Sequence, residues 1–244
     1  MLSVFYTAGF PKLNDTVSIA KSLEEAGVDF VEIGIPFSDP VADGPTIQES
    51  NKIALDNGMT VKLLLDHVRE IRKQGISMPI ILMGYLNPVM QYGMEKFVKD
   101  AAAAGADGLI LPDMPLYEYE EVYKKSFDAV NLCNTFLISP TTSEERIKKI
   151  DAASNGFIYA VSASSTTGAK SDFSDDQRNY FSRLKSMSLK NPYLIGFGIS
   201  NNATFSSACK YSAGAIVGSA FVSMLKTSSS IDSDIKNFVK SLKG

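Results

Sequence analysis

Three carboxylates within one short stretch are the residues whose types and spacing could do chemistry. Glu32 interrupts an apolar run at residues 30–35, and the loop that follows contains Asp39 and Asp43. The run has the length of a strand buried on both faces, where a charge is costly unless it points at a site or a partner. Three prolines restrict φ along the loop and so limit where Asp43 lies relative to the strand. Glu32 and Asp43 are therefore predicted to form an acid/base pair.

The composition favours a small soluble substrate over a nucleic acid. The chain has 244 residues and a formal net charge of −3, and its Lys and Arg residues are scattered along the sequence. A nucleic-acid binder would carry a basic patch or stripe. No charge run or long Pro/Gly/Ser linker divides the chain, so a single domain over residues 1–244 is predicted.

Neither a metal site nor a membrane segment is expected. Cys133 and Cys209 lie far apart without His or Cys at ligand spacing, which is typical of reduced thiols in a cytosolic protein. The lone His67 falls in a helical pattern and is predicted to be a packing or surface residue. No stretch reaches the roughly 18 apolar residues of a membrane helix, and residues 1–11 lack the basic start of a signal peptide. The protein is expected in the cytoplasm.

Strand and helix patterns alternate eight times along the chain. The strands are predicted at residues 2–7, 30–35, 79–83, 108–111, 131–138, 157–162, 193–197 and 213–217. At a length close to the roughly 250 residues typical of the fold, this alternation predicts a (β/α)₈ TIM barrel. The alternative is an open doubly wound sheet, which would want a Gly-x-Gly-x-x-Gly turn after its first strand. Residues 7–10, Thr-Ala-Gly-Phe, do not supply that turn.

Local signals set several helix and loop boundaries. Thr60 is predicted to cap a helix that runs to about residue 74. A helix over residues 95–104 is predicted to end at Gly105, where a left-handed C-cap suits glycine. Asn87 and Pro88 are predicted to mark the exit loop of the third strand.

The predicted barrel collects polar and glycine-rich segments at the C-terminal ends of its strands, where barrel enzymes place their chemistry. Glu32, Asp43, Asp113 and Tyr159 fall at or near this face, and Asp113 is open to a structural or a functional reading. Glycine-containing turns follow the sixth, seventh and eighth strands at residues 164–168, 196–200 and 218–219. Glycine lets backbone N–H groups approach a ligand, and a helix N-terminus favours anions. These turns predict a phosphate site, although glycines needed only for tight turns would look the same.

The stretch over residues 32–48 resembles the signature of the tryptophan synthase alpha chain family. It contains Pro-Phe-Ser-Asp-Pro followed by Ala-Asp-Gly-Pro-Thr-Ile-Gln, and the similarity extends from the first strand to Gly218 and Ser219. The resemblance implies a lyase that cleaves indole-3-glycerol phosphate to indole and glyceraldehyde 3-phosphate without metal or organic cofactor. It implies that Glu32 shuttles protons and that Asp43 accepts a hydrogen bond from the indole N–H. Burial is expected to raise the pKa of Glu32.

The resemblance also assigns the remaining site residues. Apolar side chains that would line the indole pocket are Phe5, Ile47, Leu82, Ile110 and Phe197. Tyr159 would lie beside the catalytic pair, and the phosphate would be held at Thr167, Gly168, Gly198, Gly218 and Ser219. Positions that would face a partner are Asp39, Pro40, Asn87 and Pro115. That partner is a pyridoxal-phosphate-dependent beta chain, in an α₂β₂ heterotetramer.

The resemblance implies two mobile loops, and the sequence differs from the family pattern at two places. The loops at residues 36–48 and 163–174 are expected to close over substrate. The free chain is expected to be a slow enzyme, and partner binding is expected to order both loops. Residues 165–168 read Ser-Thr-Thr-Gly where the family often has Gly-Val-Thr-Gly. Family members usually begin with a helix that covers the bottom of the barrel, and the sequence starts almost inside the first strand, so this helix is expected to be lacking.

Two other functions remain open at this point. Another phosphate-handling barrel, such as a sugar-phosphate isomerase or an indole-glycerol-phosphate synthase, would share the phosphate end but need a different acid/base set. A non-catalytic subunit that only activates a beta chain would not need both carboxylates.

Overall fold

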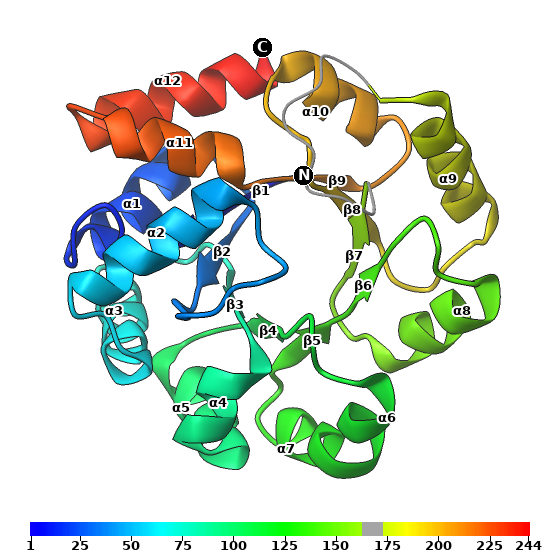
Figure 1. The fold of residues 1–244 in the computed structure, drawn as a ribbon, viewed down its shortest axis with the longest axis horizontal. Coiled ribbons are helices and arrows are strands. Elements are labelled where there is room, and N and C mark those ends of the chain that lie inside the picture. The colour runs from blue at the N-terminus through cyan, green and yellow to red at the C-terminus, as the bar shows by residue number, and fades with distance from the viewer. Residues whose placement is uncertain (163–172) are drawn as a thin grey trace.

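The computed structural model describes residues 1–162 and 173–244, which form a ring of parallel strands surrounded by helices (Figure 1). The strands are β1 (Leu2–Thr7), β2 (Phe30–Gly34), β3 (Ile80–Met83), β4 (Gly108–Ile110), β5 (Cys133–Thr135), β6 (Leu137–Ile138), β7 (Ile158–Val161), β8 (Tyr193–Gly196) and β9 (Gly214–Val217). Their order is β5-β4-β3-β2-β1-β9-β8-β7-β6, and neighbouring strands pair in parallel. The predicted (β/α)₈ barrel is confirmed.

The fifth strand of the barrel is interrupted at one residue. A continuous strand over residues 131–138 was predicted, but Phe136 separates β5 from β6, and Asn131 has a φ of 54° that no strand adopts. β5 pairs with β4, whereas β6 pairs with β7. The interruption therefore lets one chain segment serve two neighbours and closes the ring.

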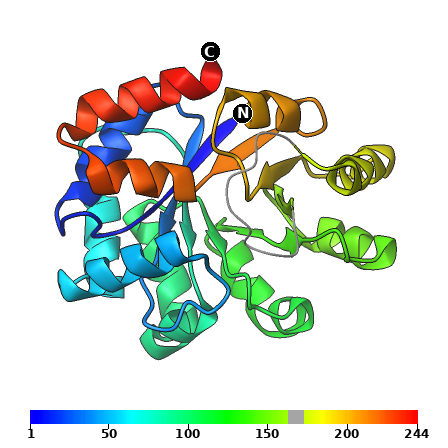
Figure 2. The same cartoon turned by 45° about the horizontal axis from the view of Figure 1, so that its top comes forward.

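The helices form the outer layer of the barrel (Figure 2). They are α1 (Asp15–Glu25), α2 (Pro45–Asp56), α3 (Val61–Lys73), α4 (Leu86–Tyr92), α5 (Met94–Ala104), α6 (Leu116–Glu118), the π-helical turn η1 (Tyr119–Tyr123), α7 (Lys124–Asp128), α8 (Glu144–Ala153), α9 (Asp175–Ser186), α10 (Asn202–Cys209), α11 (Ser219–Thr227) and α12 (Ile231–Lys243). α12 packs against α1, α10 and α11, which ties the C-terminal segment to the first helix. No helix within the described ranges is long and apolar enough to cross a membrane.

Two helices lie where loops were predicted. The loop after β2 ends at Gly44, because α2 begins at Pro45, and Asn87 and Pro88 belong to the first turn of α4. Proline is tolerated in a first turn, since the N–H groups there have no partner within the helix. The prolines that suggested loops are therefore helix starts, and Ile47 lies on a helix.

The predicted helix boundaries at Thr60 and Gly105 are confirmed. The Thr60 side chain accepts a hydrogen bond of 3.1 Å from the Leu63 N–H, which satisfies a donor in the first turn of α3. α5 ends at Ala104, and its C-cap Gly105 has a left-handed φ of 101°. His67 is buried on α3, where burial lowers the pKa of its imidazole, so it is a packing residue.

The apolar core has an outer and an inner part. The outer part contains Val31 and Ile33 of β2 and fills the space between strands and helices. The inner part joins side chains from strands all around the ring, namely Phe30, Ile81, Ile110, Phe157, Tyr159, Leu194 and Ile216. Successive side chains of a strand point to opposite faces. Glu32 therefore shares the inner face with Phe30 and points into the barrel.

Candidate active site

Glu32 is a fully buried carboxyl group inside the barrel. Its exposed fraction is 0%, and its neighbours in the strand register are Phe5 of β1 and Ile81 of β3. Ser3 Oγ donates a 3.1 Å hydrogen bond to Glu32 Oε1, whereas Oε2 has no hydrogen-bond partner within the described part of the chain. Burial raises the pKa of Glu32 to about 8, against which the Ser3 hydrogen bond acts in the lowering direction. The group therefore holds a proton at neutral pH and has one oxygen free to transfer it.

Asp43 is held by a tyrosine that follows β3. Its Oδ2 accepts a 3.1 Å hydrogen bond from the Tyr85 hydroxyl, which itself accepts a 3.0 Å bond from the Ala42 N–H. Burial raises the pKa of Asp43, and the Tyr85 bond acts in the lowering direction. The Tyr85 ring also lies 5.2 Å from the Phe37 ring, centroid to centroid. Tyr85 thus links both ends of the β2–α2 loop to the start of α4.

Tyr85 and Ser3 were not identified from the sequence. Tyr85 and the Asp43 carboxylate that it contacts are 42 residues apart in the sequence, and no local pattern predicts such a contact. Ser3 had a signal, because it lies two residues before Phe5 on the same strand and so on the same face.

Tyr159 lies within electrostatic reach of both carboxylates. Its ring is buried on β7, and burial first, then the charges of Glu32 and Asp43, raise the pKa of its hydroxyl well above the usual value. Gly196 of the neighbouring strand makes room for it, since a Cβ there would overlap the Tyr159 ring and hydroxyl. The structure thus brings Glu32, Asp43 and Tyr159 into one region, as predicted for the C-terminal face.

The predicted apolar lining divides between the two faces of the sheet. Ile110 belongs to the inner core, and Phe197 packs against it with its ring edge-on to Tyr159 at 6.1 Å. Phe5 lies beside Gly34 and Gly218, where a Cβ would come within 2.7 Å and 3.7 Å of Phe5 atoms respectively. These positions surround the mouth of the barrel near Glu32.

Leu82 does not fit the predicted lining. It belongs to the outer core, while Ile81 and Met83 on either side of it belong to or pack against the inner core. The register sets this parity, because Glu32 pairs with Ile81 and both point inward. Met83 takes the lining position assigned to Leu82. Ile47, the remaining residue of the predicted lining, does not lie on a strand: it is buried on α2, which packs against β1 and α11.

The predicted phosphate residues after the last two strands follow neighbouring strands of the barrel. Gly198 follows β8 with a φ of +80°, and Gly218 follows β9, the strand that pairs with β8. Ser219 is the first residue of α11, so the free N–H groups at the start of this nine-residue helix lie at the same end of the barrel. Thr167 and Gly168 lie outside the described residues.

The four predicted partner positions differ in exposure. Asp39, Asn87 and Pro115 are exposed, whereas Pro40 is buried. The Pro40 carbonyl accepts a 3.0 Å hydrogen bond from the Asp43 N–H, so Pro40 shapes the loop that holds Asp43. Its ring is not available to a partner in this conformation.

The other candidate residues, Asp113, Cys133 and Cys209, do not belong to the site. Asp113 accepts a 2.8 Å hydrogen bond from the Leu86 N–H, which satisfies a free donor at the start of α4. Cys133 and Cys209 are free thiols on different parts of the barrel. Over residues 1–162 and 173–244, no three His, Cys, Asp or Glu side chains gather as metal ligands do.

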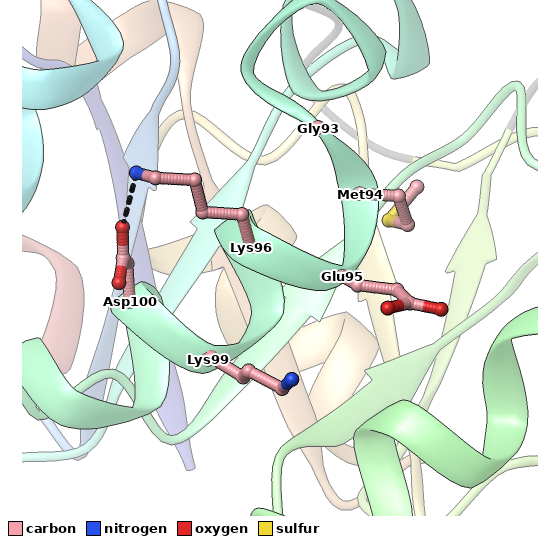
Figure 3. Close-up of a pocket in the computed structure, with 6 residues that line it drawn as sticks. All are labelled: Gly93, Met94, Glu95, Lys96, Lys99 and Asp100. Carbon is pink, nitrogen blue, oxygen red and sulfur yellow. Dashed lines mark hydrogen bonds and ion pairs between the residues drawn. The ribbon is translucent and has the colours of Figure 1, made fainter.

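A shallow depression on the outside of the barrel is separate from this region. It surrounds the start of α5 and is lined by Gly93, Met94, Glu95, Lys96, Lys99 and Asp100 (Figure 3). Lys96 Nζ forms an ion pair with Asp100 Oδ2 at 2.7 Å and lies 3.9 Å from the centroid of the Tyr92 ring. Two of its charged side chains, Lys96 and Asp100, are therefore paired with each other, and its lining does not include Glu32, Asp43 or Tyr159.

Comparison with known proteins identifies the family. The family model described as tryptophan synthase alpha chain matches residues 1–243. The alpha chain of Flavobacterium psychrophilum is 56% identical over 92% of this chain and 88% of its own length. That of Parabacteroides distasonis is 52% identical over 100% of this chain and 94% of its own length.

Solved structures agree with the sequence comparison. The tryptophan synthase alpha subunit of Legionella pneumophila str. Paris superposes with a TM-score of 0.89 at 36% identity, covering 100% of this chain and 91% of that one. A chain of the tryptophan synthase complex from Pyrococcus furiosus gives a TM-score of 0.87 at 33% identity, covering 99% of this chain and 96% of that one. This chain belongs to the tryptophan synthase alpha chain family.

Proposed function

We propose that the carboxyl pair Glu32 and Asp43 performs the alpha reaction of tryptophan synthase, the cleavage of indole-3-glycerol phosphate to indole and glyceraldehyde 3-phosphate. Membership of the family makes the chain a lyase of tryptophan biosynthesis. One observation carries the assignment of roles: Glu32 is wholly buried inside the barrel with one carboxyl oxygen unpartnered. A buried polar atom without a partner is costly, and a catalytic role is one of the explanations for keeping such an atom.

The reaction needs a proton at indole C3 before the bond to the glycerol chain breaks. A carboxyl group with a pKa of about 8 carries that proton at neutral pH, and Glu32 Oε2 is free to deliver it. The protonated ring is a cation that draws electrons from the breaking carbon–carbon bond. Glu32, now ionised, takes the proton from the adjacent hydroxyl, which becomes the aldehyde of the product, and is ready for the next cycle. A positioned acid/base group contributes roughly 10²- to 10⁴-fold to the rate.

Asp43 supports the charge that develops on the indole ring. Its carboxylate would accept a hydrogen bond from the indole N–H, and this bond strengthens as the ring becomes cationic. Tyr85 supports this role because it fixes one oxygen of Asp43 and leaves the other to the substrate. The apolar side chains of Phe5, Ile110 and Phe197 would contact the flat face and edges of the indole.

The substrate's phosphate would bind at the opposite side of the mouth. The backbone at Gly198 and Gly218 and the start of α11 present N–H groups there, and the helix N-terminus favours negative charge. Thr167 and Gly168 complete this proposed set.

The proposal assigns no cofactor to this chain and a beta chain as its partner. Pyridoxal phosphate would belong to that beta chain, which would receive indole within an α₂β₂ complex. The family membership supports the pairing, as does the likeness to a chain of the tryptophan synthase complex from Pyrococcus furiosus. The exposed residues Asp39, Asn87 and Pro115 would face the partner, and we place the reaction in the cytoplasm.

The test is indole release from indole-3-glycerol phosphate by the wild-type chain and by Glu32→Gln and Asp43→Asn, each with and without a beta chain. Glu95→Gln and Asp56→Asn make the same chemical changes on exposed helix surfaces and serve as controls. We expect both site variants to lose activity by at least about 10²-fold while the controls keep it. Activation of a beta chain by folded but inactive wild type would indicate the non-catalytic subunit, and no effect on either would indicate another phosphate-binding barrel enzyme.

A further inference from the structure

The carboxyl group of Glu32 is held from one side by a hydroxyl on the neighbouring strand. Ser3 Oγ donates to Glu32 Oε1 at 3.1 Å, and both residues have an exposed fraction of 0%. In β1 and β2, Ser3 pairs with Phe30 and Phe5 pairs with Glu32, so Ser3 lies one inward position deeper than Phe5. The serine is therefore beneath the carboxyl group and away from the mouth of the barrel.

We infer that Ser3 is a positioning residue for the reaction: it binds Oε1 from below and leaves Oε2 as the oxygen that exchanges the proton with substrate. This role rests on the proposed function of Glu32. Ser3 is too deep to meet the substrate itself, because the inward positions above it are those of Phe5 and Glu32. It acts on the reaction only through the carboxyl group.

The two carboxyl oxygens are otherwise equivalent, and the surroundings distinguish them through this single contact. Oε2 has no hydrogen-bond partner in the described ranges, and the neighbours of Glu32 in the strand register, Phe5 and Ile81, are apolar. Without Ser3, rotation about the last side-chain bond of Glu32 would exchange the two oxygens at little cost, because terminal sp³–sp² torsions are broad. The Ser3 hydroxyl therefore selects one orientation. Both strands are part of the barrel wall, so this orientation is held by rigid backbone.

The hydrogen bond also tunes the acidity of Glu32. The Ser3 hydroxyl favours the ionised carboxyl and so opposes part of the effect of burial on the pKa of Glu32. The other titratable groups in this region are Tyr159 on β7, whose pKa lies well above the assay range, and Asp43 on the β2–α2 loop. Neither contacts Ser3 through a hydrogen bond that the structure contains in its described part.

The test compares Ser3→Ala, Ser3→Thr and Ser22→Ala in the full chain with a beta chain present. Ser3→Ala removes only the hydroxyl, and Ser3→Thr restores it. Ser22→Ala is the matched control, since Ser22 is a buried serine that donates a 3.0 Å bond to the Asp232 carboxylate on the outer helices. Two readouts are used: steady-state indole release from pH 5 to pH 10, and the ionisation of Glu32 without substrate. The second is followed by the infrared carboxylic acid band that Glu32→Gln abolishes.

We expect Ser3→Ala to raise the Glu32 pKa by about one unit, as loss of one hydrogen bond to the charged form should. Its kcat should fall about tenfold, because the reacting oxygen is no longer held in place, and KM should stay within about twofold. Ser3→Thr should recover most of both, and Ser22→Ala should change neither. An unshifted Glu32 titration with unchanged kcat in Ser3→Ala would overturn the role of Ser3 while wild-type activity stands. A folded wild type that releases no indole would overturn the proposed function instead, and this role of Ser3 with it.

Discussion

Replacing Glu32 by glutamine should stabilise the fold, and by an amount that depends on pH. The folded carboxyl group has a pKa of about 8 against an ordinary value of 4.5, because burial penalises its charge. Between these two pH values the folded chain retains a proton that the unfolded chain has released, so the free energy of unfolding falls as pH rises. Glutamine is neutral throughout and lacks this term.

The magnitude follows from the two pKa values. One pKa unit corresponds to about 1.4 kcal/mol, so the difference between Glu32→Gln and wild type should grow from near zero at pH 4.5 to about 3 kcal/mol at pH 7. It should level off at about 5 kcal/mol above pH 8, an upper bound that water entering the barrel would reduce. The variant should be the more stable protein wherever wild type is the more active one.

The assay is urea unfolding of wild type and Glu32→Gln at pH 5, 6, 7, 8 and 9, with m held in common. Glu24→Gln is a control for which the pH dependence of the free energy of unfolding should have the opposite sign. Partial burial acts to raise the pKa of Glu24, but hydrogen bonds from the Met78 and Ser77 N–H groups prevail and lower it. Glu24 therefore stabilises the fold at neutral pH, and this contribution disappears as pH falls. A stability difference for Glu32→Gln that is the same at pH 5 and pH 9 would refute the buried-acid argument.

Three further variants test other contacts of the structure. Tyr85→Phe removes the hydroxyl that holds Asp43, and we expect kcat for indole release to fall about tenfold with a change in unfolding free energy of no more than about 1 kcal/mol. Gly196→Ala places a methyl group against the Tyr159 ring, so steady-state assays should show a loss of about 10²-fold; wild-type kcat would contradict the packing. Arg72→Met removes hydrogen bonds to three carbonyl groups at the bottom of the barrel, so urea unfolding should show a loss of about 2–3 kcal/mol. Activity per folded molecule of Arg72→Met should be unchanged.

The strands were predictable because a parallel barrel strand is short, continuously apolar and bounded by glycine or proline. The predicted ranges contain β1 to β4 and β7 to β9 with at most one extra residue at each end. Glu32 stood out for the same reason, as the charge in an otherwise apolar run. Patterns that act within one element are thus visible in one sequence.

Contacts between elements were not visible in this way. The run Ile-Ile-Leu-Met of β3 is apolar at every position, so nothing in it tells which side chains point inward. The pairing of Glu32 with Ile81 shows which side chains of β3 point inward, and it makes Met83, not Leu82, the lining residue. The hydrogen bond of Tyr85 is not predictable from the sequence for a related reason, because its partner Asp43 lies on a different loop. α2 and α4 were missed because proline marks both loops and helix starts.

One property of Glu32 serves both the fold and the proposed chemistry. A carboxylate inside this apolar ring would be severely destabilising, and the fold tolerates Glu32 at neutral pH because the group remains protonated. The same retained proton is what the first step of the cleavage requires. At neutral pH, ionised Glu32 then forms while the substrate is bound, when the cationic indole ring supplies the opposite charge. The Ser3 hydroxyl matters most at that stage, since it is the one protein donor beneath the carboxylate in the described structure. A stability that declines from about pH 4.5 to pH 8 and an activity that declines above pH 8 would therefore have a single cause, the raised pKa of Glu32.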